Sequence, residues 1–281
     1  MKKIKNLNLI NSMNTKTILK HLFKFSLGLS LISPLFKNDP AQAALTACAP
    51  TNTVADLSSE ADPCFLAPEM LKVTFYEIGF CTSDPLATGT FVDTTCQKSW
   101  DNSSGFLTDI GKKSFETMNG TTYKVNNGTY THAYAIMNNN WTYKAQYKFQ
   151  GGDTFYTASG GAATNIAGNY VEWEDDISDL LGEETTGLCY DYSASTSGGT
   201  VTALLTNTSL VTATDSTTCN NATRLVGSVA LSSSVTMDES VKGYKLEWKI
   251  TGMGIGITKN ASDLPGGWRG GPFTPIFTLI K

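Results

Sequence analysis

Strict alternation of apolar and polar residues dominates two segments of the chain and limits what it can fold into. Within 141–149 the odd-numbered positions hold Trp, Tyr, Ala, Tyr and Phe, while the even-numbered positions hold Thr, Lys, Gln and Lys. The segment 244–250 alternates in the same way. A period of two places all apolar side chains on one face of a β-strand. One buried and one solvated face is typical of antiparallel sheets.

Further runs rich in β-branched and aromatic residues predict additional strands, and Gly- or Asn-rich turn signals separate them. These strands are expected at 71–80, 121–125, 129–137, 153–157, 188–192, 200–205, 225–237 and 272–280. Helical spacing is found chiefly in 174–181, where Gly182 provides a stop signal. The sequence therefore predicts an all-β fold, namely an antiparallel β-sandwich of immunoglobulin-like or prealbumin-like architecture with long loops and one short helix.

A short segment supports the sandwich prediction. Gly128-Thr129-Tyr130-Thr131-His132 resembles the G-x-Y strand start that is common in prealbumin-like sandwich domains. The resemblance covers five residues and implies a sandwich architecture, without an activity or a ligand.

The first 43 residues contain the three parts of a secretory signal. Six lysines and no acidic residue occupy 1–24, an apolar run covers 25–36, and Ala41 and Ala43 form a small-residue cleavage site. The apolar run is shorter than the ~20 residues that a membrane-spanning helix needs. We expect translation from Met1 or Met13, cleavage near Ala43, and a mature chain that is secreted, periplasmic or at the cell surface.

Lipid anchoring is the alternative interpretation of this region. Leu45-Thr46-Ala47-Cys48 resembles the lipobox of bacterial lipoproteins, in which the cysteine is the lipidated residue. A lipobox normally adjoins the apolar run, whereas 37–44 separates the two here. Cleavage near Ala43 without an anchor is therefore the favoured interpretation.

The chain is expected to divide into three parts. These are the signal peptide at 1–43, an irregular N-terminal segment at 44–69 and the β-sandwich domain at 70–281. The Gly- and Ala-rich stretch 159–169 could subdivide the sandwich domain, although a long loop within one sandwich is the favoured explanation.

Cleavage would change the charge of the protein substantially. The full chain carries a formal charge of −4, but the first 43 residues hold seven of its 21 basic residues and one of its 25 acidic residues. The mature chain would therefore carry a net charge of about −10, which repels nucleic acid and anionic lipid. We expect no nucleic-acid partner, and no later stretch is apolar and long enough to predict a transmembrane segment.

All six cysteines follow the predicted leader. They are Cys48, Cys64, Cys81, Cys96, Cys189 and Cys219. An even number in an exported chain predicts three disulfides, for which fifteen connectivities exist. Pairing in sequential order would close loops of ~15–30 residues, each worth about 3 kcal/mol in the chain-entropy model. Zinc binding and thiol catalysis are not expected, because no C-x-x-C motif and no neighbouring histidine are present.

The sequence offers no familiar catalytic motif. H-E-x-x-H, G-x-S-x-G and S-x-x-K are all missing. His132, the one histidine after the predicted cleavage site, falls within a predicted strand, where a packed or hydrogen-bonded role is expected. We therefore expect no enzyme activity and no cofactor, with calcium as the alternative.

The calcium alternative depends on an acidic cluster. Seven acidic residues lie within 172–184, and calcium prefers carboxylate oxygens. Glu174, Asp175, Asp176 and Asp179 are the candidate ligands, although their spacing does not match an EF-hand loop. A solvated helix face is the other explanation, since acids in a first turn suit the helix dipole.

Two tryptophans are candidates for ligand contact. Trp268 and Arg269 lie in the Gly/Pro-rich segment 265–272, which predicts a loop with nothing local to bury an indole ring. An exposed Trp beside Arg can stack on a sugar or a protein partner. Trp100 is a lesser candidate. Alternatively, the loop folds back and covers one end of the sheet.

These features predict an exported, acidic, β-rich protein with a structural, adhesive or surface-assembly role. Its expected partners are further copies of itself or other surface proteins. The alternative is a carbohydrate- or calcium-dependent binding module with glycans as partners, and an enzyme of unrecognised type is the third hypothesis.

Overall fold

The computed structural model describes residues 45–57, 63–111, 116–178, 180, 192–196, 199–260 and 264–281. The chain divides into two compact units, Met1–Asp39 and Pro40–Lys281. Every described residue belongs to the second unit. The predicted leader and its cleavage site lie outside the described residues, as do Asp179 and Cys189.

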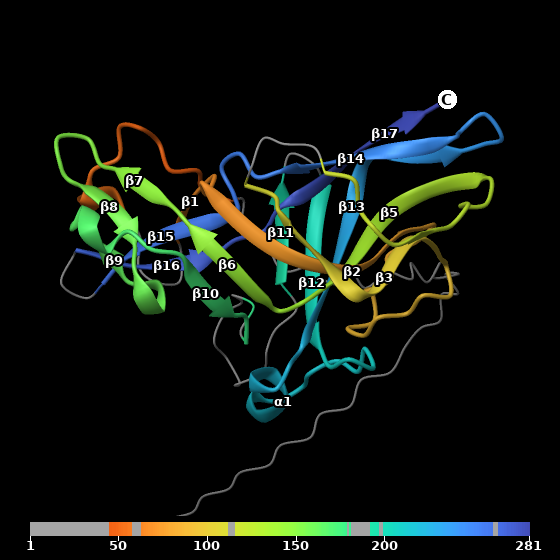
Figure 1. The fold of residues 1–281 in the computed structure, drawn as a ribbon, viewed down its shortest axis with the longest axis horizontal. Helices are drawn as coiled ribbons and strands as arrows, with labels where there is room; N and C mark the ends of the chain where they lie inside the picture. Colours follow the sequence, from red (N-terminus) through yellow and green to blue (C-terminus); the bar gives the residue numbers. More distant parts are fainter. Residues whose placement is uncertain are drawn as a thin grey trace, which may run out of the picture. The chain divides into compact units, whose positions relative to one another are not determined.

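The described part is built almost entirely from β-strands (Figure 1). The strands are β1 (Cys64–Leu66), β2 (Met70–Cys81), β3 (Cys96–Asp109), β4 (Thr121–Thr122), β5 (Gly128–Met137), β6 (Asn140–Lys144), β7 (Gln146–Lys148), β8 (Thr154–Thr157), β9 (Ala163–Thr164), β10 (Trp173–Asp176), β11 (Tyr192–Thr196), β12 (Gly199–Thr206), β13 (Arg224–Met237), β14 (Gly243–Lys249), β15 (Ile255–Lys259), β16 (Pro265–Gly270) and β17 (Thr274–Ile280). The helical elements are α1 (Ser216–Asn220) and the 3-10 turns η1 (Val54–Asp56), η2 (Ser159–Gly161) and η3 (Ala167–Asn169). All strand pairs are antiparallel.

A nine-stranded sheet forms the first layer of the fold. Its order is β10-β6-β2-β5-β13-β12-β11, with β3 beside β2 and β4 beside β3. The strands β5 and β6 lie end to end along β2, which pairs with β6 through Met70–Lys72 and with β5 through Phe75–Cys81. On the side away from β2, β5 pairs with β13 and β6 pairs with β10.

The second layer consists of the two-stranded sheet β14–β17, which packs on one face of the large sheet. Phe75 of β2 stacks on Trp248 of β14, with 4.8 Å between ring centroids. Phe80 of β2 contacts Tyr244 of β14 at 5.4 Å and Phe277 of β17 at 4.7 Å. This face-to-face packing of antiparallel sheets confirms the predicted all-β sandwich.

Two small sheets, β1-β15-β16 and β7-β8-β9, adjoin the β6–β10 end of the large sheet. An isolated bridge pairs Ala162 with Gly267 and so joins the two small sheets. The indole nitrogen of Trp268 in β16 donates a hydrogen bond to the carbonyl oxygen of Tyr156 in β8 at 3.0 Å. These contacts fix β16 next to β8 and β9.

The predicted single strand at 141–149 is split into β6 and β7, which belong to different sheets. Ala145 separates them, and its carbonyl accepts a hydrogen bond from the Thr157 amide at 3.0 Å. The predicted alternation nevertheless survives the break, because Trp141, Tyr143 and Phe149 are all buried.

The helix predicted at 174–181 is wrong for its first three residues, which belong to β10. Residues Trp173–Asp176 pair with Asn140–Tyr143 of β6, whose backbone edge supplies the partners that a strand needs. Apolar residues spaced as on a helix are a weak signal, and such pairing readily overrides them. The described α-helix lies at Ser216–Asn220 instead, where the Asp215 side chain accepts a hydrogen bond from the Thr218 amide at 2.8 Å.

Disulfides join Cys48 to Cys64 and Cys81 to Cys96, so two of the three predicted disulfides are present and both follow sequential order, among the connectivities that the sequence left open. Cys219 is also disulfide-bonded, and Cys189, which would be its partner in sequential order, lies outside the described residues. Disulfides of this kind are typical of proteins that fold in an oxidising, extracellular or periplasmic compartment. Within the described ranges, no helix has the length and apolar character needed to cross a membrane.

Replacing both Cys81 and Cys96 with Ser should lower the free energy of unfolding by about 3 kcal/mol, because the disulfide closes a 15-residue separation in the unfolded chain. Urea denaturation followed by tryptophan fluorescence would measure the change. Thr88→Ala, an exposed substitution in the same loop, serves as the control and should alter stability by less than about 0.5 kcal/mol. Equal stability of the double variant and the control would contradict the prediction.

Candidate functional site

The structure places Trp268 and Arg269 in the strand β16 and not in a loop. Ile257 of β15 pairs with Trp268, whose side chain is only 3% exposed. The expectation of an exposed indole is therefore wrong. The alternative, in which this segment folds back against the sheets, describes the observed arrangement. The neighbouring glycines permit this close packing, since a Cβ on Gly270 would overlap the hydroxyl of Tyr143.

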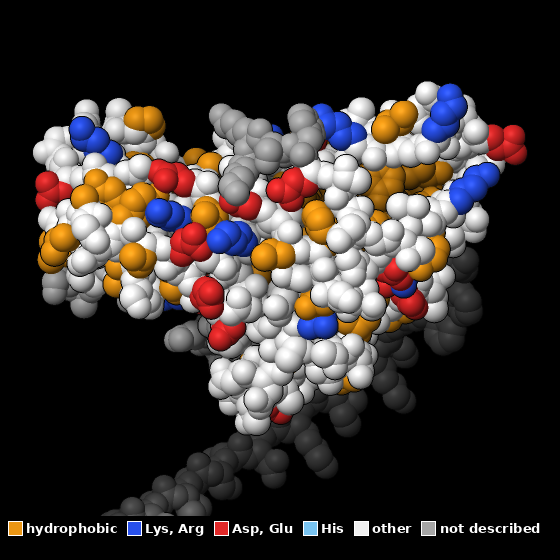
Figure 2. Space-filling view, in the orientation of Figure 1, with side chains coloured by type: hydrophobic (Ala, Val, Ile, Leu, Met, Phe, Trp, Pro, Cys, Tyr) orange, Lys and Arg blue, Asp and Glu red, His pale blue; other side chains and the backbone are white. Residues whose placement is uncertain are grey.

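Trp100 is also buried, with 3% of its surface exposed. Its ring lies edge-on to Phe106 at 6.2 Å, on the same strand β3. It lines a wide cavity of about 1490 Å3 whose other side is formed by β14. Figure 2 shows hydrophobic side chains gathered below β14, while acidic and basic side chains are distributed over the visible face. Stacking of a sugar on an exposed Trp100 is thus not supported.

Trp268 and Arg269 line a second, smaller cavity of about 290 Å3 between the two layers. Part of its wall is a patch of small and medium side chains on the inner face of the large sheet, which we call the cavity floor. The cavity floor comprises Ala133, Ala135, Val201, Ala203, Gly227 and Val229. Facing sheets lie about 10 Å apart, and such short side chains cannot fill that distance.

Aromatic residues form a large part of the remaining wall. These residues are Phe65, Tyr134, Trp141, Trp173, Trp248, Trp268, Phe273 and Phe277. Phe273 lies centrally, with its ring centroid 5.2 Å from those of both Trp141 and Trp248. Trp141 donates its indole N–H to the Asn138 carbonyl at 2.7 Å, just as Trp268 donates to Tyr156. Because these polar edges are already hydrogen-bonded, the two indoles offer the cavity apolar surface.

Four polar residues, Asp175, Asp176, Ser178 and Arg269, also line the cavity. Alternation along β10 leaves Asp175 half-buried, whereas Asp176 is exposed and accepts a hydrogen bond from the Asn140 amide group at 2.6 Å. The pKa of Asp175 is raised to about 6, because burial and the negative charge of Asp176 raise it more than the positive charge of Arg269 lowers it. A half-buried carboxyl with a perturbed pKa in a cavity is a recognised mark of functional sites.

The predicted calcium ligands do not share one face, because they lie on a strand. Glu174 and Asp176 are exposed, while Asp175 lies on the opposite, half-buried face. Among the described residues no group of three acidic, histidine or cysteine side chains is placed to hold a metal ion. Asp179 lies outside the described residues, so a calcium site that includes it stays a prediction.

Tyr143 is a residue that sequence reasoning assigned only to a strand face. Its side chain is fully buried, and its hydroxyl has no hydrogen-bond partner among the residues that the structure describes. Its ring stacks on Trp173 at 5.3 Å, and burial together with the nearby charge of Asp175 raises its pKa well above the usual value. A buried polar group without a hydrogen-bond partner lowers the stability of a fold by about 1–3 kcal/mol. The Tyr143 hydroxyl is therefore an exception that calls for a structural explanation.

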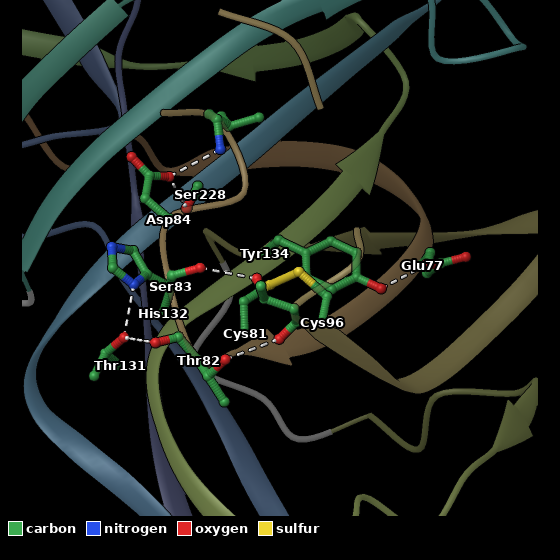
Figure 3. The surroundings of a disulfide bond; sticks show 12 residues. Glu77, Cys81, Thr82, Ser83, Asp84, Cys96, Thr131, His132, Tyr134 and Ser228 are labelled. Carbon is green, nitrogen blue, oxygen red and sulfur yellow. Dashed lines mark hydrogen bonds between the residues drawn. A yellow bond between two sulfur atoms is a disulfide. The ribbon is translucent and has the colours of Figure 1, made fainter. Parts of the chain in front are cut away.

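His132 lies near the Cys81–Cys96 disulfide (Figure 3). Its Nδ1 atom is 2.9 Å from the hydroxyl of Thr131, which in turn donates to the Thr82 carbonyl at 3.0 Å. Burial lowers the pKa of His132, and the charge of Asp84 opposes that shift. These contacts attach the loop after β2 to β5 and match the hydrogen-bonded strand role expected for this histidine.

Comparison of the chain with protein-family models, with curated proteins and with solved structures finds no match. The argument for function therefore depends on the geometry of the site itself. A concave, mostly aromatic cavity with a few polar groups and a perturbed carboxyl is the arrangement expected of a small-molecule binding site. We regard the cavity that contains Trp268, Arg269 and Asp175 as the candidate functional site.

Enlarging a side chain on the cavity floor should cost little stability. Ala135 pairs in register with Gly227, so Ala135→Leu should fill empty space and change the free energy of unfolding by less than about 1 kcal/mol. Ala145→Leu is the matched comparison, because Ala145 is fully buried and does not line the cavity. There the added atoms have no room, and a loss of about 1–3 kcal/mol is expected. Urea denaturation would compare the two variants, and similar losses would argue against the cavity.

Proposed function

We propose that the protein is an exported, non-catalytic binding protein that holds a small, largely apolar ligand between the two layers of its sandwich. The observation that carries this proposal is the aromatic cavity of about 290 Å3 over the cavity floor. The disulfides and the predicted leader support an extracytoplasmic location, reached after cleavage near Ala43.

The composition of the cavity wall indicates the kind of ligand. Ring faces and aliphatic side chains gain about 0.8 kcal/mol for each CH2 group that they remove from water. The few polar groups would contribute more to the orientation of a ligand than to its affinity. A sugar, which carries hydroxyl groups on all sides, would leave most of them without partners in such a cavity. The proposed ligand is therefore an aromatic or aliphatic molecule with few polar atoms.

The neutral fluorescent probe N-phenyl-1-naphthylamine should bind to the purified mature protein with saturable, one-to-one enhancement of fluorescence. Ala135→Leu should weaken binding at least about tenfold, because the added side chain occupies the cavity floor. Ala87→Leu adds the same atoms at an exposed position and should leave the affinity unchanged. Equal affinities of the two variants, or no saturable binding to the wild type, would contradict the proposal.

Surface assembly is a second candidate function, which a separate feature favours. In the described part of the chain, β17 pairs only with β14, so its other edge is not covered by a strand. Ile276 and Ile280 on this strand are 42% and 52% exposed. An uncovered strand edge with apolar side chains favours pairing with another chain.

Assembly through β17 should be sensitive to charge on that strand. The double substitution of Ile276 and Ile280 by Lys should abolish concentration-dependent association, because two added charges oppose strand pairing. Analytical ultracentrifugation over a hundredfold range of concentration would measure it. Leu107→Lys, which alters an exposed apolar residue on β3, is the control and should leave association intact. A wild type that is monomeric throughout would rule out this second function.

A further inference from the structure

The cavity floor is arranged in rows that run across the strands β12, β13 and β5. Residues that pair in register on neighbouring antiparallel strands lie side by side on one face of the sheet. One such row, which we call the trough, consists of Ala203, Gly227 and Ala135, and all three line the cavity. Ile78 of β2 pairs with Ala135 and closes the row at that end. Across three neighbouring strands the trough therefore contains no side chain longer than a methyl group.

Larger side chains border the trough on both sides. The first border row comprises Leu205, Leu225 and Met137, and the second comprises Val201, Val229 and Ala133. Ala133 is the smallest of these residues, but it pairs with Phe80 and belongs to the same buried cluster as that ring. The second border therefore stays closed at Ala133.

The trough is narrowest at its centre, over Gly227. The ideal Cβ position of Gly227 lies 3.2 Å from the Cε atom of Met137 and 3.9 Å from the Cδ2 atom of Leu225. Both atoms belong to the first border row, which leans over the trough at this point. The remaining width lies toward Val229, which is about 7 Å from Gly227 along the strand. A space of this width admits a single hydrocarbon chain.

From this shape we infer that the trough holds an unbranched aliphatic chain, which lies across β12, β13 and β5 and ends at Ile78. The inference rests on the proposed binding function and narrows its ligand from apolar molecules in general to those with a straight alkyl chain. The trough covers two strand spacings, which is about 10 Å. An extended chain of about eight carbons has a similar length, given C–C bonds of about 1.5 Å.

The trough offers no hydrogen bond to its occupant. Each of its three strands pairs with a neighbouring strand on both sides, so their backbone polar groups are used within the sheet. The polar residues that line the cavity come from other segments, namely Asp175, Asp176, Ser178 and Arg269. A polar group placed over the trough would lose its hydrogen bonds to water without replacement. The part of the ligand that lies there must therefore be hydrocarbon along its whole length.

The border rows also discriminate by shape. A branch or a saturated ring places carbon atoms beside the chain, where Met137, Leu225 and Val229 already stand. Added atoms without room force the surrounding side chains to shift, which weakens binding. A straight chain meets no such obstacle, and each CH2 group that it buries should raise the affinity about fourfold.

Three alcohols that each contain eight carbons and one hydroxyl group would test the inference. The mature wild-type protein is titrated with 1-octanol, 2-ethyl-1-hexanol and 2-cyclohexylethanol in competition with N-phenyl-1-naphthylamine. These compounds are matched in composition and differ in shape. The straight-chain alcohol should bind at least about tenfold more tightly than the branched and the cyclic alcohols.

A variant at one end of the trough assigns the chain to these residues. In the wild type, 1-octanol should bind about fifteenfold more tightly than 1-hexanol, because it buries two more CH2 groups. Ala203→Leu fills the β12 end and shortens the trough by one strand spacing, about 5 Å. The gain from 1-hexanol to 1-octanol should then fall below about twofold. Ala87→Leu adds the same atoms at an exposed position and should retain the full gain.

The outcomes separate the inference from the function on which it rests. If the naphthyl probe binds but the branched or cyclic alcohol competes as well as 1-octanol, the straight-chain ligand is refuted while the binding function stands. An unchanged gain from 1-hexanol to 1-octanol in Ala203→Leu would refute the position of the chain in the trough. If Ala203→Leu fails to fold, the comparison of the three alcohols on the wild type decides. Failure of the naphthyl probe to bind refutes the binding function itself.

Discussion

The unequal width of the two packed layers is the constraint on which the rest of the structure depends. Within the described part of the chain, a sheet of nine strands is covered on one face by two strands, β14 and β17, with the small sheet β1-β15-β16 adjoining one end. Where β14 and β17 lie over β2, large rings such as Phe75 and Phe80 fill the space between the layers. Where the large sheet presents Ala135 and Gly227 instead, the same spacing between the layers leaves a cavity.

Such a cavity has an energetic cost that the rest of the fold must offset. Atoms that line an empty space lose the dispersion contacts that close packing would provide. The buried hydroxyl of Tyr143 adds the cost of a missing hydrogen bond. The disulfides act in the opposite direction, because they reduce the entropy of the unfolded chain. A departure from close packing of this kind is expected of a binding site rather than of a structural core.

Much of the fold can be predicted from local sequence patterns, since alternation reports directly on which face of a strand is buried. The strands β2, β5, β13 and β14 all appear within one or two residues of their expected bounds. The strand β10 could not be predicted in this way, because its four residues are stabilised by pairing with β6, about 30 positions earlier. The strand β3 could not be predicted either, because its polar sequence shows little alternation. Its partner β2, by contrast, is among the strands that the sequence predicts most clearly.

The candidate site was only partly visible in the sequence, for a related reason. Trp268, Arg269 and Asp175 stand out in the sequence, but the sequence predicts that Trp268 and Arg269 lie in an exposed loop and that Asp175 belongs to a separate acidic cluster. Their common cavity depends on which strands become neighbours, and local patterns do not encode that. The glycines around Trp268 indicated a loop, whereas their role in the structure is to admit β16 close to Tyr143. Small residues on the inner faces of β5 and β13 are the one local signal of a cavity.

The most direct test of this account is a crystal structure of the mature protein soaked with 4-bromophenethylamine, with the bromine located by its anomalous signal. The account predicts a single strong bromine peak among the rings of Trp141, Trp248 and Phe273. Continuous side-chain density that fills the space above Ala135, with no bromine between the layers, would contradict it.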